Sequence, residues 1–508
     1  MRRFLLWALV AALGGWMWAL CFEREPLTVA PWLALAPLFL LLRSPWPGRL
    51  AFLHGLVAWM VSLSWISPTL QDFGNIAPPL SVVLTGLLSA YLAAFHTAFA
   101  WLGAPLWRRG GALRFVALPA LWVALEWLRT HLFGGFPWNL AAYAWVDVPG
   151  ALPLSAWVGA YGISFLVLLA SAGVAACVEA WSPREEGRRR RSWQPLAACL
   201  GIPLLLLPLA GRWSVRQTDN DFREIVGLGG PIRLLQPNIP NLVSLDPVKV
   251  FENYGKVISH SVAACQPGSL VIWPESAAWP FQYGRDPHFE QDLRMLVERG
   301  CTVLFNSSHP AGNSFYNSAF LLSPGDAPVA RYDKRHLVPF GEFIPFKGLF
   351  SWMDKLARNA GDFLAAEKMT LLPWNGERLG MAICYEVVYP GEVADLTKAG
   401  ATILVTITND AWYGDTAAPW QHFRAARFRA AENRRPLLRA AITGVSALVA
   451  SDGSVRASID VFKEGVIRGW VVGRTGLTPY ARATWAVPVA CTAVALFGLY
   501  FGRRRRTS

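Results

Sequence analysis

The chain has 508 residues, of which 54% are hydrophobic and only 16% are charged, and its mean hydropathy is +0.32. A soluble globular chain typically carries about 25% charged residues, so this composition argues against an ordinary soluble protein and indicates a membrane protein. The formal net charge is +13, and much of the excess lies in two arginine runs, Arg188–Arg191 and Arg503–Arg506. Each run adjoins a long apolar stretch, which favours a role in membrane topology over nucleic-acid binding.

Eight apolar stretches are long enough, or nearly so, to cross a hydrocarbon core, which requires about 20 helical residues. They lie at residues 4–22, 28–43, 50–68, 78–104, 113–130, 151–180, 194–211 and 484–502. The second is short and interrupted by prolines. We therefore expect an α-helical membrane bundle of about eight helices, seven of them within residues 1–211 and the eighth within residues 484–508, followed by a basic tail.

Arginine clusters between these stretches predict the orientation of the bundle. They comprise Arg2 and Arg3, Arg43 and Arg49, Arg108, Arg109 and Arg114, Arg184 with Arg188–Arg191, and Arg503–Arg506. All five clusters fall on one side if there are eight spans. Arginine-rich loops are retained in the cytoplasm. Both termini are therefore predicted to be cytoplasmic, and residues 212–483 are predicted to lie outside the cytoplasm.

Residues 212–483 have a different pattern, in which short β-rich runs alternate with polar, helix-like segments. The runs lie at 232–236, 269–273, 301–305, 379–383 and 401–405, and the helix-like segments at 247–264, 286–299, 390–399 and 416–434. Such alternation predicts an α/β domain with a buried sheet.

Three predicted strands end in residues that carry chemistry. Glu275 follows the run Val-Ile-Trp-Pro, Cys384 ends the run Gly-Met-Ala-Ile, and Lys334 lies in Tyr-Asp-Lys-Arg-His. Side chains at strand ends sit on rigid supports and face a cleft. A carboxylate can accept the proton of a thiol, and an ammonium can stabilise both the thiolate and the oxyanion formed when it attacks a carbonyl. These three residues are thus sufficient for thioester formation without a metal or cofactor.

Each of the three also has an ordinary structural interpretation. A single cysteine at a strand end is often a packing residue, Glu275 could cap a helix, and Lys334 could be a solvated charge among its charged neighbours. It is their combination, with the flanking residues, that is specific. The eight histidines show no metal-binding spacing, and no metal site is expected.

The flanking strings resemble those of a known family. Trp-Pro-Glu275, Tyr-x-Lys334-x-His-Leu-Val-Pro-Phe-Gly-Glu342 and Cys384-Tyr385-Glu386 are similar to the Glu-Lys-Cys motifs of the nitrilase superfamily. With eight spans, the resemblance narrows to its membrane-embedded branch, the apolipoprotein N-acyltransferases. It extends to four further strings, which are Phe136-Pro-Trp138-Asn, Asn409-Asp-Ala-Trp412-Tyr-Gly-Asp415, Pro419-Trp420-Gln-His422 and Gly476-Leu-Thr-Pro-Tyr480.

The resemblance implies an α-β-β-α sandwich for residues 212–483 and a two-step reaction. Cys384 would take the sn-1 acyl chain of a phospholipid, typically phosphatidylethanolamine. The chain would then pass to the α-amino group of the diacylglyceryl-modified N-terminal cysteine of a lipoprotein. Glu275 would be the general base and Lys334 the oxyanion stabiliser, and the supporting residues would be Glu342, Tyr385, Glu386 and Asn317.

The resemblance also implies a location. The protein would be a multi-pass protein of the inner membrane, with its catalytic domain in the periplasm. We further expect a monomer that binds no nucleic acid, and no residue pattern in the sequence reports on the oligomeric state. Cys265 and Cys301 could pair in an oxidising compartment, which the sequence leaves open.

Both substrates keep their acyl chains in the bilayer, so some residues should face lipid. The segment 346–356 mixes large apolar residues with lysines, as interfacial segments do, although a helix packed on the domain would show the same pattern. The lipid-facing candidates are Trp138, Phe350, Trp352, Trp412 and Trp420. Glu126 and Arg129 share a helix face near the outer end of the fifth span, as either a mutual pair or a contact for a lipid headgroup.

Two positions depart from the family pattern, and two other functions remain as alternatives. Leu245 stands where a tryptophan is frequent and Thr443 where an asparagine is frequent. A membrane-anchored amidase or hydrolase would use the same three residues with water as the acceptor. A transporter would require ionisable residues at the centres of several spans, and the spans are nearly free of them.

Overall fold

The computed structural model describes residues 1–25, 30–181, 194–223, 229–239, 246–325, 328–339, 341–343 and 363–504. Contacts along the chain divide it into two compact units. The helical unit comprises Met1–Ser67, Pro78–Arg216 and Ala483–Ser508, and the α/β unit comprises Pro68–Ala77 and Gln217–Arg482.

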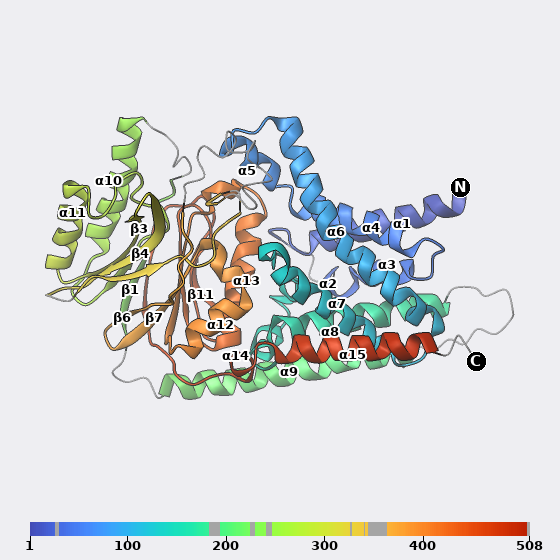
Figure 1. Cartoon of the computed structure of the whole chain (residues 1–508). Coiled ribbons are helices and arrows are strands. Elements are labelled where there is room, and N and C mark those ends of the chain that lie inside the picture. The colour runs from blue at the N-terminus through green and yellow to red at the C-terminus, as the bar shows by residue number, and fades with distance from the viewer. Residues whose placement is uncertain are drawn as a thin grey trace. The chain divides into compact units, whose positions relative to one another are not determined.

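The helical unit is built from apolar helices, most of them long (Figure 1). They are α1 (Arg2–Leu20), α2 (Ala30–Leu33), α3 (Ala36–Leu41), α4 (Pro47–Ser62), α6 (Pro78–Arg109), α7 (Arg114–His131), α8 (Ala151–Trp181), α9 (Gln194–Arg223) and α15 (Ala486–Arg504). The short α5 (Ile66–Asp72) leads into the segment 68–77 of the α/β unit, and the last residues of α9 also belong to that unit.

A helix occupies each predicted apolar stretch, but the predicted count of eight spans is not confirmed. Among the described residues, three helices, α1, α6 and α8, are long and apolar enough to cross a membrane, and α4 with α5 gives a fourth if that pair, bent by 48°, counts as one span. The second stretch is divided into α2 and α3, which together are too short. Proline interrupts the regular hydrogen bonding of a helix, and Pro31 and Pro37 lie within this stretch.

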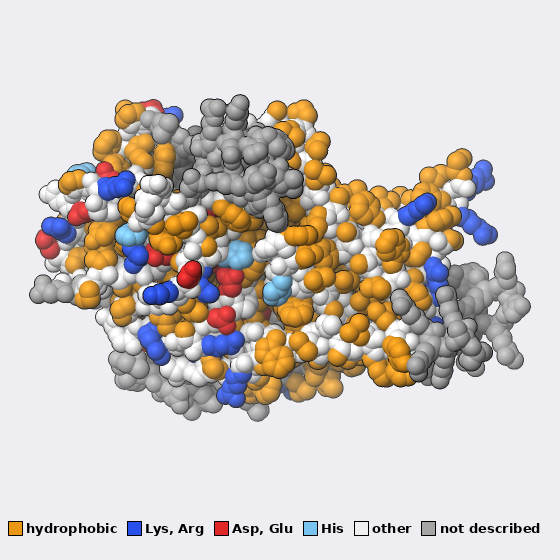
Figure 2. All heavy atoms as spheres, viewed as in Figure 1, with side chains coloured by type: hydrophobic (Ala, Val, Ile, Leu, Met, Phe, Trp, Pro, Cys, Tyr) orange, Lys and Arg blue, Asp and Glu red, His pale blue; other side chains and the backbone are white. Residues whose placement is uncertain are grey.

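The helices of this unit present large apolar side chains on their outer surface. Such residues occur on α1 (Leu5, Leu6, Leu9, Leu13), α6 (Val82, Val83, Leu87, Trp101), α9 (Ile202, Leu204, Leu205, Leu209) and α15 (Val489, Leu496, Phe497, Phe501). Figure 2 shows hydrophobic side chains over most of the visible face of these helices. Soluble proteins rarely expose apolar patches this large. The surface and the apolar helices together indicate a membrane protein.

Several of the predicted cytoplasmic arginines meet at one end of the helical unit. Arg43 forms an ion pair with Glu179 at 3.1 Å, and Arg114 lies 3.8 Å from the same carboxylate. Arg109 donates a hydrogen bond to the carbonyl oxygen of Phe501. One end of the unit thus contains the loops before α4 and α7 together with the ends of α8 and α15. The topology predicted from the arginine clusters requires this arrangement. The orientation across a membrane stays a prediction.

Glu126 and Arg129 both bind the backbone of the loop that follows α7. Arg129 donates hydrogen bonds to the carbonyl oxygens of Phe136 and Trp138, both at 2.8 Å. Glu126 accepts one from the amide of Ala141 at 2.8 Å. Both side chains are buried, so their role in the structure is to fix this loop.

The α/β unit contains two six-stranded sheets. The first has the order β12-β1-β2-β3-β4-β5 and the second β11-β10-β9-β8-β7-β6. The strands of the first sheet are β1 (Gly230–Gln236), β2 (Leu270–Ile272), β3 (Thr302–Ala311), β4 (Ser314–Leu322), β5 (Ala330–Asp333) and β12 (Gly465–Val471). Those of the second are β6 (Leu371–Trp374), β7 (Glu377–Ile383), β8 (Ile403–Thr408), β9 (Leu437–Ala441), β10 (Ser446–Val449) and β11 (Val455–Ile459).

The two sheets pack face to face over a shared apolar core. Ile232, Leu270 and Leu304 of the first sheet belong to the same buried cluster as Met381 and Val405 of the second. The other face of the first sheet packs on α10 (Pro247–Ala264) and α11 (Pro287–Glu298), and α12 (Pro390–Lys398) and α13 (Ala418–Asn433) contact the second (Figure 1). This is an α-β-β-α sandwich, as the resemblance implies.

Cys265 and Cys301 form a disulfide bond in the α/β unit, with their Cα atoms 5.9 Å apart. Cys265 ends α10, and Cys301 immediately precedes β3. The pairing that the sequence leaves open is therefore present in the structure.

Candidate active site

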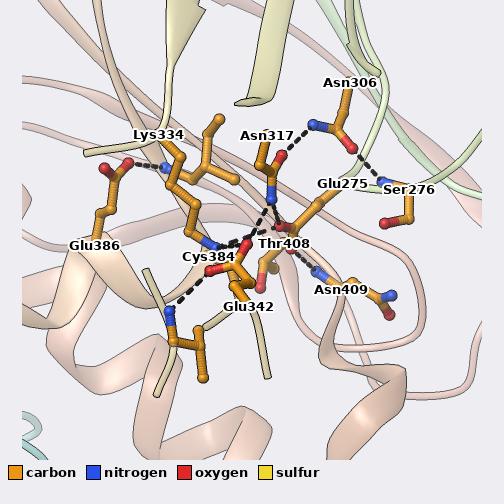
Figure 3. Close-up of polar contacts among 12 residues, drawn as sticks. Glu275, Ser276, Asn306, Asn317, Lys334, Glu342, Cys384, Glu386, Thr408 and Asn409 are labelled. Carbon is orange, nitrogen blue, oxygen red and sulfur yellow. Dashed lines mark hydrogen bonds and ion pairs between the residues drawn. The ribbon is translucent and has the colours of Figure 1, made fainter. Parts of the chain in front are cut away.

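The three predicted catalytic residues converge in the α/β unit (Figure 3). Glu275 follows β2 and Lys334 follows β5, both in the first sheet, whereas Cys384 follows β7 in the second. All three side chains are buried, with exposed fractions of 5%, 1% and 6%. The site thus lies where ends of the two sheets meet, and each residue is carried by a rigid strand end.

Lys334 is held between two carboxylates. Its Nζ donates a hydrogen bond to Oε1 of Glu342 at 2.9 Å and lies 3.6 Å from Oε1 of Glu275. Burial alone would lower the pKa of Lys334, but Glu342 and then Glu275 outweigh it, and the pKa lies well above its usual value. The ammonium therefore stays charged at any physiological pH.

Asn317 on β4 joins the same two carboxylates. Its Nδ2 donates to Oε1 of Glu275 at 2.9 Å and to Oε1 of Glu342 at 2.8 Å. Its Oδ1 accepts a hydrogen bond from Asn306 at 2.7 Å, which fixes the orientation of the amide. Oε2 of Glu275 accepts a further bond from the backbone amide of Asn409 at 3.0 Å. Both oxygens of Glu275 are therefore held in place.

Cys384 begins a short 3-10 turn after β7 and has a φ of 52°. A residue with a side chain in this left-handed region costs about 1–3 kcal/mol and persists only where its surroundings enforce it. Burial, followed by the charge of Glu275, raises the pKa of the thiol, and Lys334 opposes the rise. The sulfur therefore rests as a neutral thiol, and a nearby base must take its proton before it can act as a nucleophile.

Glu386 joins the segment after Lys334 to the segment that carries Cys384. It accepts hydrogen bonds from the backbone amides of Arg335 at 2.6 Å and Ile383 at 2.6 Å, and from the hydroxyl of Tyr332 at 2.9 Å. Burial raises its pKa to about 7, although Lys334 and the backbone amides oppose the rise. This side chain fixes the relative positions of the cation and the thiol without contacting either.

We expect Glu386 to give the protein a measurable pH dependence of stability. Because its pKa is about 7 in the folded chain against 4.5 for a free carboxyl group, the folded state binds the proton more tightly. Its stabilising contribution is present below pH 4.5 and is lost as the pH rises through about 7, by on the order of 3 kcal/mol. Thermal unfolding in detergent should show this loss in the wild type and not in Glu386→Gln. Parallel pH profiles for the two proteins would contradict it.

The remaining supporting residues lie around this core. Oε2 of Glu342 accepts a hydrogen bond from the amide of Val338, and Tyr385 is buried with its ring 5.3 Å from that of Tyr389. The four predicted supporting residues therefore all lie at the site, and Glu342 and Asn317 contact the predicted triad directly.

The lipid-facing candidates have different environments. Trp412 is 40% exposed, and its ring packs on Phe73 in the segment 68–77, at 4.3 Å. Trp420 is half-buried on α13. Trp138 is 2% exposed inside the helical unit, which gives no support for lipid contact. Phe350, Trp352 and the segment 346–356, as well as Leu245, lie outside the described residues.

Sequence reasoning missed Asn306 and the part played by Thr408, which lies beside the thiol and lowers its pKa. Asn306 donates to Asn317 because β3 and β4 form an antiparallel pair, and this pair is not predicted from the sequence. The polar run Asn306-Ser-Ser at the end of an apolar strand is a signal that could have suggested it.

Two family models cover most of the chain. Residues 232–479 match a carbon-nitrogen hydrolase model, so the sandwich and its buried Glu, Lys and Cys belong to an enzyme of the carbon-nitrogen hydrolase superfamily. Residues 14–173 match a model described as the apolipoprotein N-acyltransferase N-terminal domain.

Full-length relatives narrow the class further. The chain is 32% identical to the apolipoprotein N-acyltransferase of Geobacter metallireducens, over 98% of this chain and 96% of the relative. It is 33% identical to that of Ralstonia nicotianae, over 98% and 93%. The chain therefore belongs to the apolipoprotein N-acyltransferase family.

Solved structures similar to the chain cover about half of it. A mutant of the Nesterenkonia AN1 amidase from the nitrilase superfamily is 20% identical, with a TM-score of 0.38, over 51% of this chain and 95% of the amidase. Saccharomyces cerevisiae Nit3, a member of branch 10 of the same superfamily, is 17% identical, with a TM-score of 0.37, over 51% and 94%.

Proposed function

We propose that this protein transfers the sn-1 acyl chain of a phospholipid, typically phosphatidylethanolamine, to the N-terminus of a diacylglyceryl-modified lipoprotein. The observation that carries the proposal is the convergence of Glu275, Lys334 and Cys384 in a chain that is similar to N-acyltransferases along almost its whole length. The reaction needs neither a metal nor a cofactor, because these three side chains supply the base, the cation and the nucleophile.

The first step forms a thioester. Glu275 takes the proton of the Cys384 thiol, and the sulfur attacks the carbonyl carbon of the sn-1 ester. The Lys334 ammonium stabilises the negative oxygen of the tetrahedral intermediate, a contribution typically worth about 3–4 kcal/mol of barrier. When the intermediate collapses, the carbon–oxygen bond breaks, Glu275 returns its proton to the leaving oxygen, and a lysophospholipid departs.

The second step transfers the acyl chain to nitrogen. The α-amino group of the lipoprotein attacks the thioester carbonyl, and Glu275 accepts a proton from that nitrogen. The carbon–sulfur bond then breaks, and the proton held by Glu275 passes to the sulfur. The amide product leaves, and the free thiol is restored for another cycle.

This reaction places the site outside the cytoplasm, where mature lipoprotein N-termini are found. We propose the arrangement expected from the arginine clusters, with both termini cytoplasmic, residues 212–483 in the periplasm, and a monomer in the inner membrane. The Cys265–Cys301 disulfide supports an oxidising compartment for the α/β unit, because cytosolic thiols are kept reduced.

Mass spectrometry of the protein purified from membranes tests the mechanism. We expect an adduct with the mass of a palmitoyl-sized acyl chain on Cys384, because the thioester accumulates when no amine acceptor is present. The adduct should be absent from Cys384→Ser and Glu275→Ala proteins. An adduct on another residue, or active enzyme that never carries one, would contradict the mechanism.

The product formed from the acyl-enzyme separates this function from the amidase or hydrolase alternative. Incubation with a synthetic diacylglyceryl-cysteine peptide should give an N-acylated peptide and a lysophospholipid in equal amounts. Release of the free fatty acid at the same rate with and without peptide would favour a hydrolase that uses water as the acceptor.

A further inference from the structure

Three fully buried side chains inside the α/β unit form a cluster next to the backbone of Cys384. His422 comes from α13, Asp410 from the turn after β8, and Arg439 from the middle of β9, and all three are 0% exposed. Nε2 of His422 lies 3.0 Å from the backbone carbonyl oxygen of Cys384. These residues therefore reach the nucleophile through its peptide group and not through its sulfur.

The contacts of His422 determine where its proton lies. A carbonyl oxygen can only accept, so Nε2 carries the hydrogen and donates it to Cys384. Arg439 places one NH2 group 2.7 Å from Oδ2 of Asp410 and 3.1 Å from Nδ1 of His422. Burial and then the charge of Arg439 lower the pKa of His422. Nδ1 lies within hydrogen-bond distance of both the guanidinium of Arg439 and the carboxylate of Asp410, which together fix the orientation of the ring.

Asp410 holds this arrangement together as an anion. Burial alone would raise its pKa, but Arg439 and His422 lower it to about 2. Its Oδ1 accepts a hydrogen bond from Thr408 at 2.7 Å and lies 3.1 Å from Nδ1 of His422. Gly444 leaves the space that this carboxylate occupies, because a Cβ atom at that position would overlap Oδ2.

We propose that His422 is a positioning residue for acyl transfer, which holds the peptide of Cys384 in its left-handed conformation and thereby directs the sulfur toward Glu275 and Lys334. Cysteine has no intrinsic preference for the left-handed conformation, and the hydrogen bond to the carbonyl oxygen keeps the peptide from leaving it. Asp410 and Arg439 hold the ring so that Nε2 points at this carbonyl oxygen. This role rests on the function proposed above.

The test compares two substitutions of His422. In enzyme active sites a displacement of about 1 Å can cost about 100-fold in rate. His422→Leu keeps a buried side chain but removes the donor, and we expect thioester formation from phosphatidylethanolamine to slow by roughly 10- to 100-fold in kcat, with KM within twofold of wild type. His422→Gln can still donate at the position of Nε2, and we expect it to recover most of the loss.

Alkylation of Cys384 by iodoacetamide gives a second readout that requires no lipid substrate. If His422 directs the sulfur toward Lys334, its loss should move the pH of half-maximal alkylation upward in His422→Leu and not in His422→Gln. Wild-type protein that forms no thioester with phospholipid would overturn the proposed function, whereas the alkylation profiles would still decide the role of His422.

Gln236→Leu is a matched control. Gln236 is also 0% exposed and donates to backbone carbonyl oxygens, but to those of Asp460 and Lys463 and not to that of Cys384. We expect it to lower the temperature of unfolding without changing kcat per folded molecule or the alkylation profile. The proposal is overturned if His422→Leu behaves like Gln236→Leu, or if His422→Gln is as impaired as His422→Leu at equal thermal stability.

Discussion

Replacing Glu275 by glutamine should slow thioester formation by about 100- to 10,000-fold, the range typical for loss of a general base. The amide has the shape of the carboxylate and keeps one acceptor oxygen, which can bind either Asn317 or the amide of Asn409, so the fold should persist with the loss of one of these two hydrogen bonds. What is lost is the ability to take the proton of a thiol whose pKa is raised by burial. Single-turnover measurement of the Cys384 adduct by intact-protein mass checks the effect.

The control for this substitution is Glu298→Gln, an exposed carboxylate at the end of α11. It removes the same charge from the same unit and should leave the rate unchanged. A Glu275→Gln protein that retains a rate within tenfold of wild type would remove Glu275 from the role of base and leave deprotonation of the thiol to another group.

Lys334→Met should impair both stability and activity. The substitution leaves Glu275 and Glu342 buried without their shared cation, and breaking a buried pair in this way typically costs about 3–5 kcal/mol. Loss of the oxyanion stabiliser should also slow thioester formation by about 100- to 1,000-fold. Thermal unfolding and single-turnover kinetics measure the two effects separately.

The pH dependence of this substitution follows from the raised pKa of Lys334. Such a group contributes its full stability below its unfolded pKa of 10.5, and this contribution is lost only as the pH rises through the higher folded value. The difference between wild type and Lys334→Met should therefore be present throughout pH 6–9. Adding Glu342→Gln to Lys334→Met should restore part of the stability but none of the activity. Restored activity would contradict the role of the cation.

The sequence predicts the elements that have strong local signals. The helix-like segment 247–264 coincides with α10, where Asp246 caps the N-terminus through the amide of Val248 and Pro247 begins the first turn. The five predicted strand runs all match strands of the structure. The strand β9 is not predicted, because Arg439 stands in the middle of five buried residues. Its charge is balanced there by Asp410, which lies 29 residues earlier in the chain.

The candidate site is partly predictable for a similar reason. Glu275, Lys334 and Cys384 follow apolar runs that can be recognised locally, and motif resemblance supplies Glu342 and Asn317. The way in which Asn317 joins two carboxylates depends on the pairing of β4 with β3 and β5, which composition does not specify. Hydropathy likewise does not fix the count of spans, because the second apolar stretch contains Pro31 and Pro37 and is divided into two short helices.

The disulfide between Cys265 and Cys301 has a practical consequence for work with this enzyme. The 36-residue separation of the two cysteines encloses β2, α11 and Glu275 itself within one covalent loop. In the chain-entropy model a bridge over a loop of this length stabilises the folded chain by about 4 kcal/mol. Reductant in a purification buffer, or synthesis in a reducing host compartment, would therefore weaken the segment that carries the proposed base, and preparations should be compared with and without dithiothreitol before any variant is judged inactive.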